Sequence, residues 1–202
     1  MEYNLKNIQT LRTGTTTIGF TIKDGVILAT ESQATAGDYV ATKKANKLYQ
    51  VSKNIGITIS GGVADCQYLL RLLQALIRLR ELDFDKSMSV KSAVGLLSTL
   101  MFQNRYFRYY SMLLIGGFDE SGSRLYSMDF FGSVLEEKDM VSVGSGSVMA
   151  IGVLESDWKK DLSVAEGIEL AKTAIESARR RDAASGGEFQ IAVIDKSGFK
   201  FV

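Results

Sequence analysis

The stretch of sequence that decides the fold is GTTTIGFTIKDGVILATE, residues 14–31. Apolar and polar side chains alternate through TTTIGFTIK and again through VILAT, which is typical of half-buried strands. Asp24 and Gly25 lie between the two runs and favour a two-residue type I′ turn. The stretch therefore predicts an antiparallel hairpin whose first strand begins at Thr15.

A second strand pair and a long helix are predicted next. The runs KLYQV and IGITIS have the composition of strands, and Gly61 and Gly62 permit an abrupt change of direction after them. A helix is expected to begin near Val63. Its buried face is predicted by five leucines that recur at helical spacing, namely Leu69, Leu72, Leu73, Leu76 and Leu79.

The remaining sequence predicts further helices and strands. A second helix is expected from about Ser89 to Arg105, followed by strands in SMLLIGGFD, SRLYSMD and DMVSVGSG. Ser163 and Glu166 form a capping-box pattern at the start of another helix, and FQIAVI and GFKFV have the patterning of last strands. The order of strands, two helices, strands, two helices and strands predicts one α/β domain with its sheets between helices.

The composition indicates a globular chain with no membrane or nucleic-acid partner. The 202 residues are 46% hydrophobic and carry a net charge of +1. No apolar run approaches the roughly 18 residues of a membrane span, and the polar first 14 residues lack the apolar centre of a secretory signal. Cys66 has no second cysteine with which to pair. We therefore expect a soluble, cytoplasmic protein.

The absence of histidine narrows the chemistry. It excludes Ser-His-Asp and Cys-His catalysis and, with a single cysteine, the ordinary zinc sites, so that neither a metal nor a cofactor is expected. The segment GSGSVMAIG, interpreted as a loop, lacks the Lys-Ser/Thr ending of a phosphate-binding loop. A hydrolase of this composition therefore needs another base.

An N-terminal threonine would supply that base. A hydroxyl nucleophile needs a group that takes its proton, and a free α-amino group with a pKa of about 7.7–8.0 suits this task near neutral pH. The missing side chain of Gly14 leaves room for the Thr15 hydroxyl to attack the preceding carbonyl, so a cut between these two residues is the hypothesis. The alternative is that the threonine-rich run is an ordinary strand edge.

Six motifs, in this order, resemble those of a known family. They are GTTTIGFTIKDGVILATE, KKANKLYQ, ISGGVAD, GSGS, GVLES and RRRDAASGG. Together they resemble the archaeal proteasome β subunits, threonine proteases of the N-terminal nucleophile hydrolase superfamily. The resemblance implies a four-layer αββα sandwich of two antiparallel sheets between helix pairs. It also implies a propeptide, residues 1–14, removed by autocleavage, and a catalytic domain, residues 15–202.

The resemblance also implies roles for single residues. Thr15 matches the nucleophile, Glu31 its acidic partner, and Lys47 the lysine whose charge favours the ionised hydroxyl. Gly61 matches the position whose N–H faces the developing oxyanion. The residues that would surround the α-amino group and relay protons are Ser145, Asp182 and Ser185. Taken singly, these residues also fit an ordinary ion pair and ordinary turns.

The family's specificity pocket corresponds to six residues without formal charge. They are Ala34, Ala45, Tyr49, Ile59, Val63 and Gln67. Because this lining is mostly apolar, cleavage after large apolar residues is predicted. Gln33 stands where the family commonly has arginine, and its effect on the region around Lys47 is left open.

An assembly is implied as well. The chain is expected in seven-membered β rings stacked between rings of α subunits, with a regulatory ATPase acting through the α ring and unfolded polypeptide as substrate. One alternative is an unprocessed, inactive β-type subunit that only fills the ring. An α-type subunit fits less well, because the polar segment 1–14 is too short for the N-terminal helix of that class. A different amidase of the superfamily is the remaining enzyme alternative.

Overall fold

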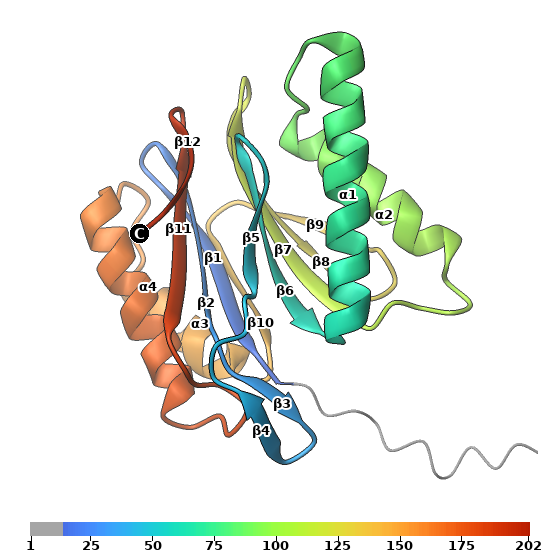
Figure 1. The fold of residues 1–202 in the computed structure, drawn as a ribbon. Coiled ribbons are helices and arrows are strands. Elements are labelled where there is room, and N and C mark those ends of the chain that lie inside the picture. The colour runs from blue at the N-terminus through green and yellow to red at the C-terminus, as the bar shows by residue number, and fades with distance from the viewer. Residues whose placement is uncertain (1–13) are drawn as a thin grey trace, which may run out of the picture.

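Two antiparallel sheets lie face to face between two pairs of helices in the computed structural model, which describes residues 14–202 (Figure 1). The first sheet has the strand order β10-β1-β2-β11-β12. Its strands are β1 (Thr16–Ile22), β2 (Gly25–Glu31), β10 (Met140–Gly144), β11 (Phe189–Asp195) and β12 (Gly198–Phe201). Thr15 directly precedes β1, which has a neighbouring strand on each side.

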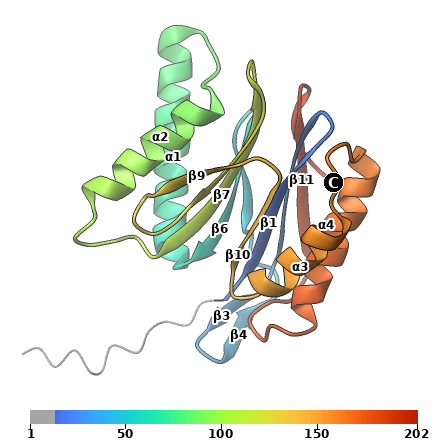
Figure 2. The ribbon, with the colours of Figure 1, turned by 180° about the vertical axis from the view of Figure 1, so that it is seen from behind.

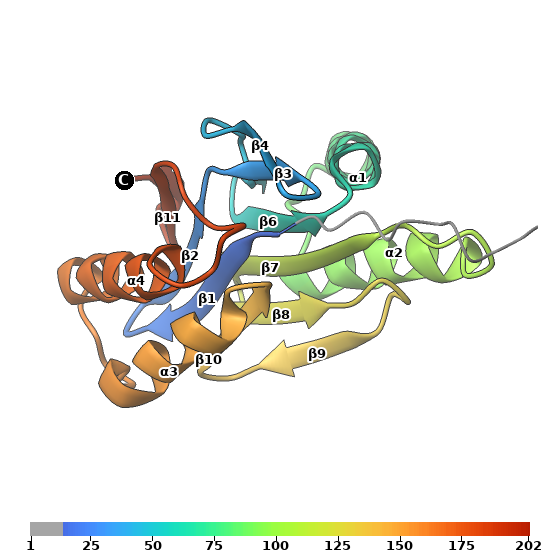
Figure 3. The same cartoon turned by 90° about the horizontal axis from the view of Figure 1, so that it is seen from below.

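The second sheet has the strand order β5-β6-β7-β8-β9. Its strands are β5 (Leu48–Ser52), β6 (Ile55–Gly61), β7 (Ser111–Asp119), β8 (Gly122–Met128) and β9 (Val134–Glu137). A separate hairpin is formed by β3 (Ala34–Ala36) and β4 (Tyr39–Thr42). Figure 3 shows this hairpin beside the start of β1 and the end of β6.

The helices form the two outer layers. The second sheet is covered by α1 (Val63–Phe84) and α2 (Val90–Gln103), and the first by α3 (Ser147–Asp157) and α4 (Val164–Arg179) (Figure 2). One group of buried apolar side chains lies under each helix pair, and a third fills the space between the sheets. The predicted four-layer αββα order is therefore confirmed. No helix within residues 14–202 has both the length and the apolar character needed to cross a bilayer.

The N-terminus of α4 shows how local sequence fixes an element. The Ser163 hydroxyl accepts a hydrogen bond from the Glu166 N–H, and the Glu166 carboxylate accepts one from the Ser163 N–H. This is the predicted capping box, and it satisfies main-chain groups that the helix leaves free. Gly167 follows on the face toward the sheet, where a Cβ would lie 2.6 Å from Cδ1 of Ile27. The helix can therefore pack closely on β2.

The turn of the first hairpin differs from the prediction. Ile22 pairs with Gly25, so the turn residues are Lys23 and Asp24 instead of Asp24 and Gly25. Neither has a positive φ, so the expected type I′ turn is wrong. Gly25 is needed for another reason, because a Cβ there would lie 2.6 Å from the carbonyl oxygen of Ile194 on β11. Tertiary packing, and not the turn, accounts for this glycine.

The buried face of α1 is also rotated from the predicted one. Leu69 and Leu73 are buried as expected, whereas Leu79 is 58% exposed. The residues buried on this helix are Cys66, Leu69, Leu70, Leu73 and Ile77. They follow one row of i, i+3 and i+4 neighbours, and Leu79 lies off that row. The spacing of the leucines therefore predicted burial for residues that lie at the edge of the buried face or outside it.

Four further elements were not placed by the sequence. Most of GSGSVMAIG, interpreted above as a loop, forms the beginning of α3. The hairpin of β3 and β4 and the edge strand β9 have largely exposed side chains. Exposed strands lack the alternation that burial on one face imposes.

Candidate active site

Thr15 is buried at the point where the chain enters β1, and it is still joined to Gly14. Its hydroxyl donates a 2.6 Å hydrogen bond to the carbonyl oxygen of Gly14. Its main-chain N–H donates to the hydroxyl of Ser145 at 3.1 Å. The Thr15 hydroxyl therefore lies directly beside the carbonyl group of the bond that the sequence predicted to be cut.

Lys47 and Glu31 form a buried pair next to this hydroxyl. The Lys47 Nζ lies 3.0 Å from Oγ1 of Thr15 and 2.5 Å from Oε1 of Glu31. The side chains of Lys47 and Glu31 are 6% and 0% exposed. Burial lowers the pKa of Lys47, and the negative charge of Glu31 opposes that change without reversing it. The Lys47 amine therefore contacts the Thr15 hydroxyl and loses its own proton more easily than the amine of an exposed lysine does.

Main-chain groups hold the Glu31 carboxylate in place. Its Oε1 accepts a hydrogen bond from the N–H of Thr16 at 3.2 Å. Its Oε2 accepts from the N–H groups of Gln33 at 2.6 Å and Gly186 at 3.0 Å. A buried polar group needs such hydrogen-bond partners to offset its loss of water. The pair therefore connects the end of β2 to the segment that follows α4.

Asp182 is the centre of a second polar network. Its Oδ2 accepts hydrogen bonds of 2.6 Å from the hydroxyls of both Ser145 and Ser185. Ser185 also lies 2.7 Å from the Thr16 hydroxyl, which must donate this bond because the Ser185 proton points to Asp182. The three residues thus come together beside the main-chain nitrogen of Thr15. The structure brings the whole predicted set around one peptide bond.

Gly61 ends β6 in a conformation that favours glycine. Its φ is +123°, and a Cβ there would lie 2.3 Å from the carbonyl oxygen of Tyr110. The same residue lines the cavity that contains Thr15 and a second cavity that Ser145 lines. Gly61 is therefore required by the turn that ends β6, and its main chain can also lie close to a substrate, as predicted.

A cavity of about 240 Å³ opens beside Thr15 and Gly14. All six predicted pocket residues line it, namely Ala34, Ala45, Tyr49, Ile59, Val63 and Gln67. The sequence missed Thr35, Asn46 and Cys66, which line it as well. Cys66 stands one helical turn after Val63, a spacing that could have indicated it. Burial raises the pKa of the Cys66 thiol to about 12, so it remains protonated and packs as a small apolar group.

Gln33 supports the segment that carries Asp182. Its Nε2 donates a 3.0 Å hydrogen bond to the carbonyl oxygen of Ala183, and its main-chain N–H binds Glu31. Gly186 passes so close that a Cβ would lie 2.5 Å from the Gln33 side-chain oxygen. Through its main-chain N–H and its side-chain amide, Gln33 therefore links Glu31 to the segment that carries Asp182, without adding a charge.

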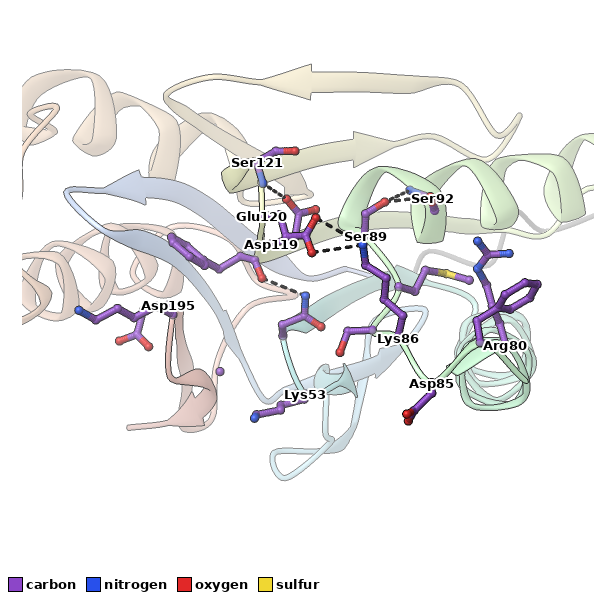
Figure 4. A pocket seen from close by; sticks show the side chains of 17 residues that line it. Lys53, Arg80, Asp85, Lys86, Ser89, Ser92, Asp119, Glu120, Ser121 and Asp195 are labelled. Atoms are coloured by element: carbon purple, nitrogen blue, oxygen red, sulfur yellow. Dashed lines mark hydrogen bonds and ion pairs between the residues drawn. The ribbon is translucent and has the colours of Figure 1, made fainter. Parts of the chain in front are cut away.

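A larger cavity, whose lining side chains Figure 4 shows, lies at the opposite end of the sheets. It measures about 740 Å³ and is bounded by the α1–α2 loop and three strand turns. Basic side chains such as Lys53 and Arg80 alternate there with Asp85, Asp119 and Asp195. It contains no residue of the Thr15 site. Across residues 14–202 no cluster of His, Cys, Asp and Glu side chains is arranged to hold a metal ion.

Comparison with known proteins agrees with this geometry. Residues 11–194 match the family described as "Proteasome subunit". A "Proteasome subunit beta" of Methanosphaerula palustris is 46% identical over 96% of this chain and 92% of its own length. That of Methanoculleus marisnigri is 44% identical over 97% of this chain and 92% of its own length. That of Archaeoglobus profundus is 43% identical over 92% of this chain and 86% of its own length. The chain therefore belongs to the proteasome subunit family, and its relatives place it among the β subunits.

Proposed function

We propose that this chain is a proteolytic β subunit, a threonine endopeptidase that becomes active when the Gly14–Thr15 bond is cut. Proteasome β subunits are generally threonine proteases. The observation that carries the proposal is the position of the Thr15 hydroxyl between the Gly14 carbonyl, 2.6 Å away, and the Lys47 amine, 3.0 Å away. The 2.6 Å contact joins Oγ1 to the carbonyl oxygen, so the hydroxyl stands beside the carbonyl group that it would attack and beside a cationic partner, as covalent catalysis requires.

The first step is removal of residues 1–14, of which 1–13 lie outside the described residues. The Thr15 Oγ1–H adds to the Gly14 carbonyl carbon, and the C–N bond then breaks as its nitrogen takes the proton. This leaves an ester between Gly14 and Oγ1 and a free α-amino group on Thr15. Water hydrolyses the ester, which restores the hydroxyl and releases a peptide ending in the Gly14 carboxylate.

The same groups then act on substrate. The free amino group of Thr15, held by Ser145, takes the hydroxyl proton while Oγ1 forms a bond to the substrate carbonyl carbon. Lys47 stabilises the negative charge that develops on Oγ1, and the Gly61 N–H stabilises the oxyanion. The C–N bond breaks as the amino group passes its proton to the leaving amine. Water then hydrolyses the acyl-enzyme ester.

Membership of the family implies that the chain assembles with other proteasome subunits. We propose further that it occupies seven-membered β rings between α rings, in the cytoplasm, with a regulatory ATPase acting through the α ring. Unfolded polypeptide is the proposed substrate. An extended chain fits this role because a folded protein cannot present its main chain to a threonine as deeply buried as Thr15, which is 4% exposed.

The test of the proposal is the intact mass of the chain after assembly with a proteasome α subunit. We expect the mass of residues 15–202, together with hydrolysis of fluorogenic peptides by the assembled particle. A chain that keeps its first 14 residues and hydrolyses no peptide would instead be the unprocessed, structural β-type subunit. That result would overturn the proposed enzyme while leaving its family membership intact.

Cleavage after large apolar residues is expected to depend on the width of the cavity beside Thr15. Ala45 lines that cavity, and Ala45→Val adds two methyl groups to a wall facing the substrate side chain. Because one methylene changes discrimination by about 10–200-fold, we expect the kcat/KM ratio of Phe to Ala substrates to fall by about tenfold. Matched peptides that differ only at the residue before the cut measure it. Ala41→Val, an exposed alanine outside the cavity, should leave the ratio unchanged.

A further inference from the structure

A second cavity, of about 250 Å³, lies on the other side of Gly61 from the first. It is lined by the end of β6, the start of β7, the β8–β9 loop and the end of β10. Its lining residues are Ser60, Gly61, Tyr110, Ser111, Met112, Phe130, Gly144 and Ser145. Thr15 lines the first cavity, and Ser145, whose hydroxyl accepts a hydrogen bond from the Thr15 N–H, lines the second, so both cavities adjoin the Thr15 site.

The orientation of Gly14 indicates which half of a substrate each cavity receives. Gly14 precedes the bond to be cut and lines only the first cavity of the two, which therefore holds the half that becomes the acyl group. The leaving amine must depart toward the group that protonates it. That group is the Thr15 nitrogen, which lies 3.1 Å from the Ser145 hydroxyl in the wall of the second cavity. The leaving half thus faces the second cavity.

Aromatic and apolar side chains give this second cavity its chemical character. The rings of Tyr110 and Phe130 are stacked with their centroids 6.1 Å apart and an angle of 9° between their planes. Met112 adds a polarizable apolar surface, and no lining residue carries a formal charge. An apolar or aromatic side chain can add to such a stack, whereas a carboxylate would lose its hydration and meet no positive charge among the lining residues.

Ser111 is a second and independent sign of a ligand. It lines the cavity, it is 1% exposed, and its hydroxyl has no hydrogen-bond partner within residues 14–202. Buried hydroxyls are almost always paired in proteins. A peptide group of the leaving half supplies both a donor and an acceptor for it. The cavity therefore combines an apolar wall for a side chain with a free polar group for main chain.

We propose that this second cavity binds the residue that follows the scissile bond and selects for an apolar or aromatic side chain there. The proposal rests on the proposed function, since it needs a substrate cut at Thr15. It extends that function to the leaving half of the substrate. Tyr110 and Phe130 are then specificity-determining residues, and cleavage preference depends on both sides of the bond.

The test uses two internally quenched peptides that differ only in having Phe or Asp directly after the scissile bond. With the processed, assembled particle we expect kcat/KM to be about tenfold higher for the Phe peptide. Phe130→Ala should reduce this ratio to about twofold, and Tyr110→Ala should reduce it similarly. Phe84→Ala is the control, because Phe84 is an exposed aromatic residue that lines the cavity at the other end of the sheets and not this one. Mass analysis of the products verifies the position of the cut.

A peptidyl methyl ester, which has no side chain after the scissile bond, shows whether a variant remains intact. Phe130→Ala should hydrolyse it at the rate of the unsubstituted particle. Equal kcat/KM for both peptides would overturn the inference and leave the proposed function standing. So would a preference that Phe130→Ala and Tyr110→Ala leave unchanged, or one that Phe84→Ala reduces equally. Hydrolysis of neither the peptides nor the ester would overturn the proposed function itself.

Discussion

Replacement of Thr15 by alanine is expected to abolish both the cut after Gly14 and the hydrolysis of peptides. The hydroxyl is the group that lies 2.6 Å from the Gly14 carbonyl oxygen, and no other hydroxyl is bound to that carbonyl within residues 14–202. Loss of a covalent nucleophile costs on the order of 10⁴-fold in rate or more. The chain should keep its first 14 residues, which an intact-mass measurement of the assembled particle detects.

A matched control for Thr15→Ala is available two residues further along β1. Thr17 is also buried, but its hydroxyl has no hydrogen-bond partner within residues 14–202. Thr17→Val keeps the shape of the side chain and should retain processing and activity. Thr15→Ser, which keeps a hydroxyl, should still be cut. Peptide hydrolysis by a homogeneous Thr15→Ala particle would show that the nucleophile has been assigned wrongly.

The fold could be predicted from sequence where local patterns and burial agree. The strands β1 and β2 are buried on both faces, and their short runs of apolar and threonine side chains are typical of such strands. Ser163 with Glu166 marks the start of α4 within four residues of sequence. The turn at Lys23 and Asp24 was missed because contact with β11, distant in sequence, determines where Gly25 stands. Local pattern cannot report such a contact.

The site could be predicted only in part from the residues themselves. The lack of histidine and the Gly14–Thr15 junction led by chemical reasoning to the hypothesis that Thr15 is the nucleophile, with an ordinary strand edge as the alternative. Lys47 is 32 residues from Thr15 in sequence, and no spacing rule connects them, so the resemblance had to supply it. Ser111 and Phe130 were missed altogether. Their importance depends on the shape of a cavity that forms only when β7 and the β8–β9 loop meet β10.

Lys47 could assist Thr15 in two ways, by its positive charge or by giving up a proton. The observed donors fit an ammonium group that binds both the Glu31 carboxylate and the Thr15 hydroxyl. Burial nevertheless lowers the pKa of Lys47, which makes loss of a proton easier than in water. An arginine would keep the positive charge and could not give up its proton in the same range. Lys47→Arg therefore separates the two properties.

Lys47→Met is expected to slow both processing and peptide hydrolysis by roughly 10²–10⁴-fold, the usual contribution of a positioned proton-transfer or charge-stabilising group. Methionine keeps much of the apolar stem, while Glu31 retains its three main-chain donors, so the local structure has support without the amine. Single-turnover rates of propeptide removal and steady-state hydrolysis of an apolar peptide provide the measurements. Thermal unfolding and particle assembly report whether the variant folds.

Lys47→Arg should be as slow as Lys47→Met if a displaceable proton or a compact amine is needed at 3.0 Å from Oγ1. Activity close to that of the unsubstituted chain would instead mean that positive charge alone is sufficient. Lys44→Met, at an exposed lysine three residues earlier, should leave both rates unchanged. Normal rates in Lys47→Met, in a particle that assembles and unfolds normally, would reduce the buried pair to a structural ion pair. The activation of Thr15 would then have to come from the Asp182 network alone.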